Sequence, residues 1–305
     1  MSEFLLSNEP IVRLSAFAAV FTVMALWEVL APRREQGIGR TVRWPGNLGV
    51  VVLDTLLVRI IFPTTAVGLA LLAEAKGFGL FNAWPVANWI AIVVSVVILD
   101  LVIYLQHVLF HAVPALWRLH RMHHADLEFD LTTGARFHPI EILLSMLIKI
   151  TVIGALGAPA VAVLIFEVLL NATAMFNHSN VRLPAPVDRV LRLLVVTPDM
   201  HRVHHSVVVR ETNSNFGFNL PWWDRLFGTY RTEPAAGHEG MIIGVDEIRD
   251  PAEQRLDRML TQPFRAGDSA YALGRREGGE RDDANLSGRS EARNQHNHLL
   301  MMNQQ

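Results

Sequence analysis

The sequence contains no cysteine, and this absence excludes several kinds of site. Disulfides, thiolate-ligated haem, iron–sulfur clusters and cysteine-ligated zinc all need a thiol. Charged residues are also scarce, at 18% of the 305 residues against 51% hydrophobic residues, and the mean hydropathy is positive. Any metal ion must therefore be bound by nitrogen or oxygen, and the composition favours an integral membrane protein over two soluble domains.

Two other signals are weak or missing. The formal net charge of −2 gives no indication of a nucleic-acid partner, and the chain shows no solenoid-type repeat. The first ten residues lack the basic start of a secretory signal, and no small-residue cleavage pattern precedes Arg33 and Arg34. We therefore expect the first apolar stretch to be retained as a membrane span.

Four apolar stretches predict the spans: residues 11–31, 48–73, 86–106 and 140–176. The first three have about the 20 residues that a helix needs to cross a bilayer, and Trp84 and Trp89 suit interfacial anchors. The fourth is too long for one span, and Gly154, Gly157 and Pro159 interrupt it. We expect a helical hairpin there, which either crosses the bilayer or enters and returns.

Basic residues predict the orientation, because cytoplasmic loops are enriched in arginine and lysine. Between the second and third spans there is only Lys76, whereas four arginines lie between the first two: Arg33, Arg34, Arg40 and Arg43. The first loop should then be cytoplasmic, and the third span should deliver His107 to the cytoplasmic face. A hairpin keeps His138 and His178 on that same face.

Histidine is the dominant chemical signal. Ten of the thirteen histidines lie between positions 107 and 205, and eight form three clusters: His107 and His111; His120, His123 and His124; and His201, His204 and His205. On a helix, positions i, i+3 and i+4 share a face, whereas adjacent residues diverge by about 100°. Neighbouring imidazoles can therefore reach two different metal ions. His138 and His178 stand alone, and either could be a ligand or a core residue.

The histidine set suits a dimetal centre. Neutral imidazole binds iron, zinc and copper, and ten nitrogens could give two ions about five ligands each, with a position left open for oxygen. Carboxylate-bridged di-iron bundles use duplicated Glu-x-x-His pairs, which this sequence lacks. We therefore expect an all-nitrogen ligand set.

At this point the sequence resembles a known family. The three ordered clusters are similar to the signature of the membrane fatty acid hydroxylase and sterol desaturase superfamily. Further motifs resemble its bacterial sterol desaturase branch, and alkylglycerol monooxygenases share this kind of ending: Phe137-His138-Pro139, Asn177-His178-Ser179-Asn180, Thr197-Pro198-Asp199-Met200, Asn215-Phe216-Gly217 and residues 221–229.

The resemblance implies an all-α membrane base of about four transmembrane helices under a cytosolic helical cap. It implies two iron ions, with zinc possible in purified protein, and molecular oxygen as co-substrate for lipid hydroxylation or desaturation. The implied ligands are His107, His111, His120, His123, His124, His138, His178, His201, His204 and His205. No cytochrome b5-like domain is fused, so the electron donor should be a separate protein: cytochrome b5-like, a ferredoxin or a reductase.

The same resemblance frames the domain prediction. We expect residues 1–232 to form the membrane domain, with the cap made of 107–139 and 177–232. Residues 233–305 should be a polar extension, disordered beyond about 265. The expected location is a bacterial inner membrane, with the active site facing the cytoplasm.

Three acidic residues could orient ligand imidazoles through the second ring nitrogen: Asp126, Glu141 and Asp199. Each could equally be a solvated acid or a helix cap. Surface positions are expected for the three remaining histidines: His238, His296 and His298. Charged residues in or near the apolar stretches should be structural, and the tryptophans around Trp222 should be interfacial anchors rather than the lining of a lipid entrance.

Two other functions remain open at this stage. A non-redox membrane zinc hydrolase could use Glu141 as its base, but the sequence lacks the H-E-x-x-H motif. A metal-binding membrane transporter usually places its ligands near the bilayer midplane, whereas these clusters come after the spans at one face.

Overall fold

The computed structural model describes residues 2–62, 64–84, 86–265 and 271–273. Within these ranges the regular structure is helical, and β pairing is limited to two isolated bridges, Pro32 with Val181 and Ser206 with Ile243. This confirms the predicted all-α class. The long helices are α2 (Glu9–Leu30), α3 (Arg40–Ile61), α6 (Asn88–Ala112), α8 (Pro139–Leu156) and α9 (Ala160–Asn177).

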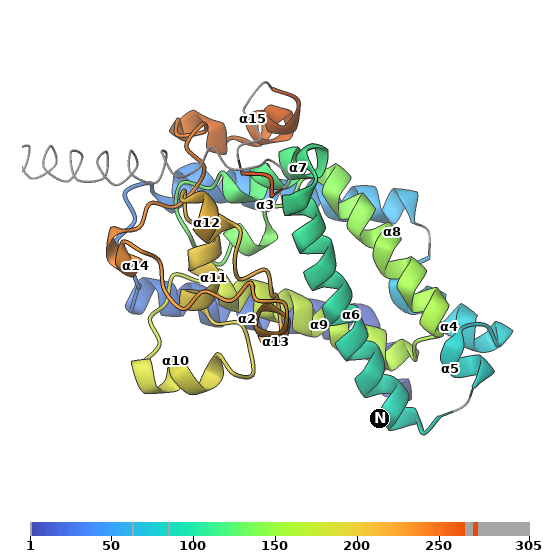
Figure 1. Cartoon of the computed structure of the whole chain (residues 1–305). Coiled ribbons are helices and arrows are strands. Elements are labelled where there is room, and N and C mark those ends of the chain that lie inside the picture. Colours follow the sequence, from blue (N-terminus) through green and yellow to red (C-terminus); the bar gives the residue numbers. More distant parts are fainter. Residues whose placement is uncertain (1, 63, 85, 266–270, 274–305) are drawn as a thin grey trace, which may run out of the picture.

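The shorter helices complete the base and build the cap. They are α1 (Ser2–Ser7), α4 (Ala66–Lys76), α5 (Leu80–Ala83), α7 (Pro114–His124), α10 (Ala185–Leu191), α11 (Pro198–His204), α12 (Val209–Thr212), α13 (Trp222–Leu226), α14 (Gly237–Gly240) and α15 (Leu256–Thr261). In Figure 1, α6 and α8 both extend from the neighbourhood of α7. Helix α8 runs toward α4 and α5, whereas α6 runs down to the end of the chain marked N, and α11, α12 and α14 lie at the left of the molecule.

Five stretches are long and apolar enough to cross a membrane: Glu9–Leu30, Arg40–Ala83, Asn88–Ala112, Pro139–Leu156 and Ala160–Asn177. Helix α9 packs against α2, α4 and α6. Large apolar side chains such as Leu26, Val52 and Leu105 remain exposed on the outer faces of these helices. Such an outward apolar surface is what lipid tails require. The protein is therefore an all-α integral membrane protein.

The predicted hairpin is present. Helix α8 ends at Leu156, and Gly157 adopts a left-handed conformation with φ 59°. The Gly157 amide donates to the Gly154 carbonyl, and the Ala158 amide donates to the Ile153 carbonyl. Glycine reaches this conformation without the steric penalty of a side chain, so it ends the helix and reverses the chain. Each leg of the hairpin has 18 residues.

The second predicted span differs from a single helix over 48–73. Helix α3 ends at Ile61, and Phe62 leaves the helical region with φ −111° and ψ 89°. A residue that precedes proline disfavours the helical region, and Pro63 comes next in the sequence. Helix α4 then begins after Thr65, whose side chain accepts a hydrogen bond from the Gly68 amide at 3.0 Å. The apolar stretch is therefore divided between α3 and α4.

Helix α3 also begins earlier than expected, at Arg40, and its first turns enter the cap. Arg43 is fully buried, with its Nε 2.6 Å from Asp126 Oδ1 and its Nη1 2.7 Å from Asp130 Oδ2. Asn47 and Thr133 donate further hydrogen bonds to Asp126. In the sequence, Arg43 was expected in a loop between two spans. In the structure it joins α3 to the segment after α7.

A second buried ion cluster lies among the spans. Glu167 of α9 pairs with Lys149 of α8 and, at 2.6 Å, with Arg13 of α2. A charge inside a membrane is costly unless it is paired, and this cluster pairs each member. Three spans are thereby connected.

The domain boundary expected at 232 does not separate the cap from the residues after it. Met259 of α15 packs with Val50 of α3 and Met122 of α7, so residues 233–265 belong to the folded body. Beyond 265, Tyr271 is also buried. The rest of the predicted disordered region, including His296 and His298, lies outside the described residues.

Replacing Arg43 with methionine should destabilise the protein by about 3 kcal/mol or more, because two buried carboxylates lose their cation. Unfolding by SDS in mixed micelles, monitored by tryptophan fluorescence, measures this. Arg59→Met is the matched control, since Arg59 lies on the same helix with an exposed side chain. Equal stability of the two variants would contradict the structural role of Arg43.

Candidate metal centre

Nine histidines converge from the ends of four helices. His107 and His111 occupy the last two turns of α6, and α7 begins directly after Val113 with Pro114. Proline suits the first position of a helix because its missing amide hydrogen would have no partner there. His120, His123 and His124 lie in the last turns of α7, His178 caps the end of α9, and the third cluster lies at the end of α11.

The nine side chains form two groups, and within each group one nitrogen per ring lies within 4.8 Å of the others. The five-histidine group is His107, His111, His120, His124 and His204. The four-histidine group is His123, His178, His201 and His205. Adjacent residues fall into different groups: the rings of His123 and His124 stand at 90° and those of His204 and His205 at 79°. This is the divergence that helical spacing predicts.

Hydrogen bonds at Nδ1 hold most of these rings. Six of the nine Nδ1 atoms contact an acceptor oxygen: His107 with the Phe216 carbonyl (2.7 Å), His111 with Asn213 Oδ1 (3.1 Å), His120 with Glu141 Oε1 (2.7 Å), His123 with the Arg136 carbonyl (3.2 Å), His178 with the Ala174 carbonyl (2.8 Å) and His204 with the Ser214 carbonyl (2.7 Å). An acceptor at Nδ1 requires the proton there. Each of these rings therefore presents a lone pair at Nε2.

The Nε2 atoms approach one another closely. His107 and His120 are 3.0 Å apart, His111 and His124 3.2 Å, and His178 is 3.1 Å from His201. In the His107–His120 pair, and in the His123–His178 pair at 3.3 Å, both rings carry the proton on Nδ1, so two lone pairs face each other and repel. A cation between two such lone pairs is attracted by both. His204 Nε2 and both ring nitrogens of His205 are buried without a hydrogen-bond partner, which is costly without a ligand. The donor set therefore fits metal ions.

Burial sets the charge of the rings. Burial is the main reason that the pKa of His120 and of His178 is lowered to about 3, and at His178 neighbouring imidazoles contribute to this lowering. Burial first, and repulsion between imidazoles second, also hold the pKa well below its usual value for His123, His124, His201, His204 and His205. The rings are neutral at pH 7, the form that binds metals.

Aromatic side chains enclose both groups. Phe137 stacks on His123 with ring centres 4.4 Å apart and planes at 10°. Phe216 lies 5.0 Å from His111, and Phe218 lies 5.5 Å from His107 and 5.8 Å from His201. This apolar wall limits the access of water.

Only one of the three candidate acids hydrogen-bonds to a clustered histidine. Glu141, in the first turn of α8, accepts from His120. Asp126 instead pairs with Arg43, and Asp199 pairs with Arg202 and, at 3.3 Å, with Arg33. These two carboxylates hold the cap together and lie one layer further from the rings.

His138 lies outside both groups, so the structure brings together nine of the ten predicted ligands. It precedes Pro139 as the extended residue that caps α8, and its Nδ1 accepts from the Ile140 amide at 3.2 Å. Its Nε2 donates to the Leu260 carbonyl at 3.3 Å. Both ring nitrogens are thus used by the backbone. His238, which was expected at the surface, is largely buried: its side chain is 9% exposed and lies 3.8 Å from Asp199. It is also outside the two groups.

Several supporting residues have no clear sequence signal. The loop after α12 directs the Ser214 and Phe216 carbonyls at two histidines. Asn215, at its centre, adopts φ 52°, a conformation that asparagine tolerates better than most residues. The side-chain amide nitrogen of Asn215 donates to the backbone carbonyls of Met200 and Arg231. The Asn215-Phe216-Gly217 motif suggests a turn, but the direction of a carbonyl depends on the tertiary fold.

Residues 271–273 close the other side of the five-histidine group. Tyr271 stacks on Trp117 at 5.6 Å, and Trp117 lies 4.8 Å from His111. The Leu273 amide donates to the His111 carbonyl at 3.0 Å, and Asn213 donates to the Tyr271 carbonyl at 2.8 Å. Leu273 therefore fixes the backbone of His111, and Tyr271 fixes the side chain of Asn213, which hydrogen-bonds to the His111 ring.

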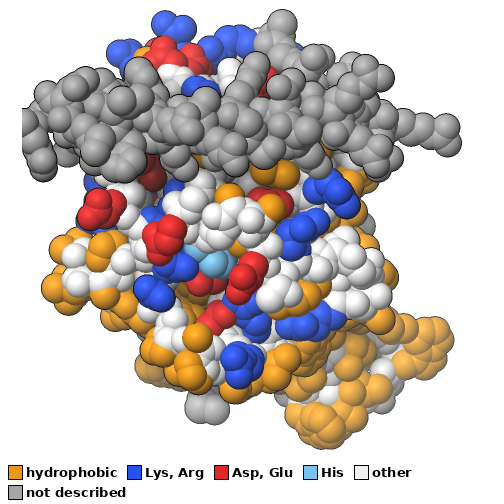
Figure 2. All heavy atoms as spheres, turned by 60° about the vertical axis from the view of Figure 1, so that its left-hand side comes forward, with side chains coloured by type: hydrophobic (Ala, Val, Ile, Leu, Met, Phe, Trp, Pro, Cys, Tyr) orange, Lys and Arg blue, Asp and Glu red, His pale blue; other side chains and the backbone are white. Residues whose placement is uncertain are grey.

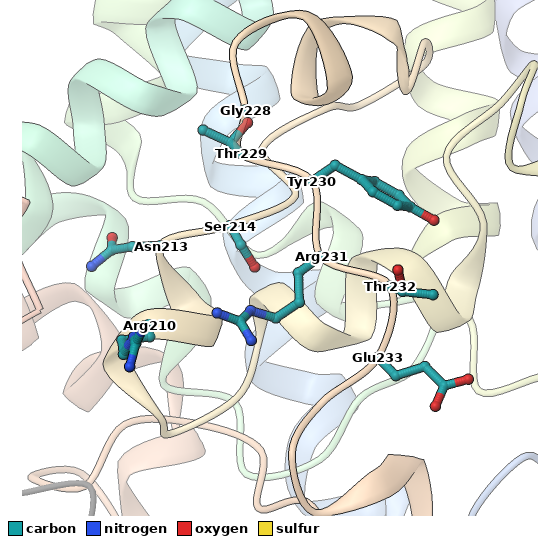
Figure 3. Close-up of a pocket in the computed structure, with 9 residues that line it drawn as sticks. All are labelled: Arg210, Asn213, Ser214, Gly228, Thr229, Tyr230, Arg231, Thr232 and Glu233. Atoms are coloured by element: carbon teal, nitrogen blue, oxygen red, sulfur yellow. The ribbon is translucent and has the colours of Figure 1, made fainter.

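A polar pocket of about 640 Å³ opens on the cap (Figure 3). Arg210, Tyr230, Arg231 and Glu233 line it, together with Asn213 and Ser214. The last two contact His111 and His204 on their far side. None of the nine clustered histidines lines the pocket, so it lies behind the candidate centre rather than at it.

The model of the family described as fatty acid hydroxylase matches residues 92–229, which include all nine clustered histidines. Residues 92–229 are a fatty acid hydroxylase domain. This places that part of the chain in the superfamily that the histidine spacing resembles. The fatty acid hydroxylase domain begins within α6 and ends after α13, so Tyr271 lies outside it.

Curated relatives agree with this domain. The chain is similar to the ornithine lipid hydroxylase OlsE of Rhizobium tropici, with 34% identity over 50% of this chain and 45% of that protein. It is also similar to human alkylglycerol monooxygenase, with 25% identity over 47% of this chain and 30% of that protein. Rat cholesterol 25-hydroxylase is 26% identical over 53% of this chain and 53% of that protein. The chain spans about half or less of the length of these relatives. No solved structure matches it.

Replacing Glu141 with leucine should weaken metal binding by roughly 10- to 100-fold, because His120 loses the partner that fixes its protonated nitrogen. Glu141→Gln keeps an acceptor oxygen and should lose less than this. Titration of metal-free protein with Fe²⁺ or Co²⁺ under anaerobic conditions measures both. Equal affinities for Leu and Gln would show that the hydrogen bond to His120 does not matter.

Replacing Tyr271 with alanine should cost about 3 kcal/mol of stability, because it removes a buried aromatic ring from Trp117. Tyr271→Phe keeps the stacking and should cost about 1 kcal/mol through the lost hydroxyl contact with the Val207 carbonyl. Thermal denaturation of the detergent-solubilised protein compares them. A tyrosine that only covers the surface would leave both melting temperatures unchanged.

Proposed function

We propose that this protein is an oxygen-dependent lipid hydroxylase whose nine clustered histidines bind two iron ions. The observation that carries the proposal is the pair of buried, neutral imidazole groups inside the fatty acid hydroxylase domain. The five-histidine group would hold one ion and the four-histidine group the other. Imidazole ligands also suit zinc and copper, so the choice of iron rests on the reaction proposed.

Bound iron would supply the oxygen activation that no protein side chain provides. Inserting one oxygen atom into a C–H bond consumes O₂, two electrons and two protons, and it releases one water. A separate electron-donor protein supplies the electrons in this proposal. The chain's own residues hold the rings through Nδ1, keep them neutral by burial and limit water with the aromatic wall.

The substrate we propose is a membrane lipid. Phe218 packs with the buried apolar residues of α4, α6 and α9 and also contacts His107 and His201. An apolar layer of side chains therefore continues from the spans to the histidines. The relatives named above are a hydroxylase of ornithine lipids, a monooxygenase of alkylglycerols and a hydroxylase of cholesterol. These names favour hydroxylation over desaturation.

We also propose a cytoplasmic orientation for the centre, because four arginines lie between the first two predicted spans, which follows the positive-inside rule. Arg33 and Arg34 precede α3, and Arg40 and Arg43 lie in its first turn. A transporter is less favoured, since His107 and His111 lie at the end of α6 rather than at its middle. A zinc hydrolase is less favoured because the similar proteins are hydroxylases and monooxygenases.

Expression in a heterologous bacterium under ¹⁸O₂ tests the proposal by mass spectrometry of total lipids. We expect a lipid class that gains one ¹⁸O atom with the wild-type chain. His204→Ala and His205→Ala should each remove this product and lower the iron content of purified protein. His238 lies outside both histidine groups, so the His238→Ala variant should keep the labelled product and the iron content.

Two outcomes would contradict the assignment. One is an oxygenated lipid that persists in the His204→Ala, His205→Ala double variant. The other is wild-type protein that binds iron but changes lipids without incorporating oxygen from O₂.

A further inference from the structure

Exposed apolar side chains gather on two short helices that belong to none of the five candidate spans. In α10 and the residues after it they are Val187, Val190, Leu193 and Leu194, and in and after α13 they are Trp222, Leu226 and Phe227. Each is between 45% and 69% exposed. We call this surface the α10–α13 face. A cluster of this kind on a cap needs a partner, because isolated soluble surfaces rarely expose so many large apolar groups together.

The two helices form one rigid surface. Trp222 Nε1 donates to the Leu193 carbonyl at 2.8 Å, and Arg225 donates to the Arg192 carbonyl at 3.0 Å. In Figure 1, α10 projects below the cap, on the same lower side of the molecule as α13. The apolar residues of α10 and α13 therefore act together.

This surface is fixed to a membrane span. Trp223 Nε1 donates to Asp100 Oδ2 of α6 at 2.8 Å, and the Leu220 amide donates to the same oxygen at 3.3 Å. Phe227 stacks on Tyr104 of α6 with ring centres 5.5 Å apart. Tyr104 lies one helical turn before His107, so the face meets α6 where this span approaches the cap.

The charges of the face have one sign. Arg182, Arg189 and Arg225 are exposed, whereas both acids of the two helices are buried. Asp188 pairs with Arg192, and Asp224 accepts from the amides of Phe216 and Gly217. What remains outward is apolar and cationic. Figure 2, which brings this side forward, shows hydrophobic side chains along the lower part, and Lys and Arg side chains interspersed with Asp and Glu side chains above them.

We propose that the α10–α13 face lies in the headgroup layer of an anionic phospholipid leaflet. Its apolar side chains would enter the acyl boundary, and its arginines would contact lipid phosphates. Apolar surface combined with basic residues is the composition of helices that lie in the membrane interface. Continuity with α6 favours the leaflet over a soluble protein. The inference rests on the chain crossing a bilayer and not on the proposed reaction.

The absence of cysteine permits a direct test with single labels. Leu193→Cys and Leu226→Cys carry a nitroxide in nanodiscs of mixed phosphatidylglycerol and phosphatidylcholine. Asp257→Cys on α15 is the control, because its side chain is exposed and α15 lies on the opposite side of the molecule in Figure 1. Power-saturation spectroscopy then compares collisions with apolar O₂ and with water-soluble nickel-EDDA.

We expect labels at 193 and 226 to collide more with O₂ and less with nickel-EDDA, and the label at 257 to show the reverse. Equal nickel-EDDA access at all three positions would overturn the proposal. So would labels that become protected only when an electron-donor protein is added, because the face would then bind a protein.

The arginines are tested separately. The triple variant Arg182→Gln, Arg189→Gln, Arg225→Gln should retain several-fold less phosphatidylglycerol on purification in detergent, since each basic residue near an anionic surface contributes roughly fivefold. Its iron content should match the wild type, which separates a failure here from a failure of the proposed function. Unchanged phosphatidylglycerol retention would exclude the anionic lipid contact.

Discussion

The structure depends on keeping nine buried imidazoles neutral while their Nε2 atoms converge. A protonated ring in this space would repel its neighbours, and burial alone already opposes the charge. The hydrogen bonds at Nδ1 complete the arrangement, because each fixes the proton on the side away from the group. For six of the nine rings, the carbonyl, carboxylate or amide oxygen at Nδ1 is therefore as necessary to the centre as the histidine itself.

This requirement explains why helix ends build the site. The last turns of α6, α7 and α11 and the end of α9 supply the rings, while loops near them supply carbonyl acceptors. The loops must then be rigid. Arg43 holds the segment after α7, and Asn215 holds the loop after α12. Arg43 and Asn215 thus fix the loops that position the histidine rings, although neither side chain contacts a ring.

The folded unit extends past the fatty acid hydroxylase domain in both directions. Helices α2 and α3 precede it, and α15 and Tyr271 come after it. Tyr271 and Trp117 cover the five-histidine group from one side, and Phe137, Phe216 and Phe218 cover the histidines from others. The apolar wall is continuous with the membrane helices. A water-limited centre next to lipid tails is the environment that oxygenation of an apolar chain requires.

The sequence by itself determined the all-α membrane class, the helical hairpin and the three histidine clusters. Each follows from a local rule: apolar length, the helix-breaking tendency of Gly157 and Pro159, and the 3.6-residue period that separates His123 from His124. It did not determine that His138 would cap α8, that Arg43 would be buried or that α3 and α4 would divide one apolar stretch. Nor could it assign Asp126 and Asp199 to arginines rather than histidines. Only the tertiary structure decided these points, because a side chain's partner depends on which distant segments pack beside it.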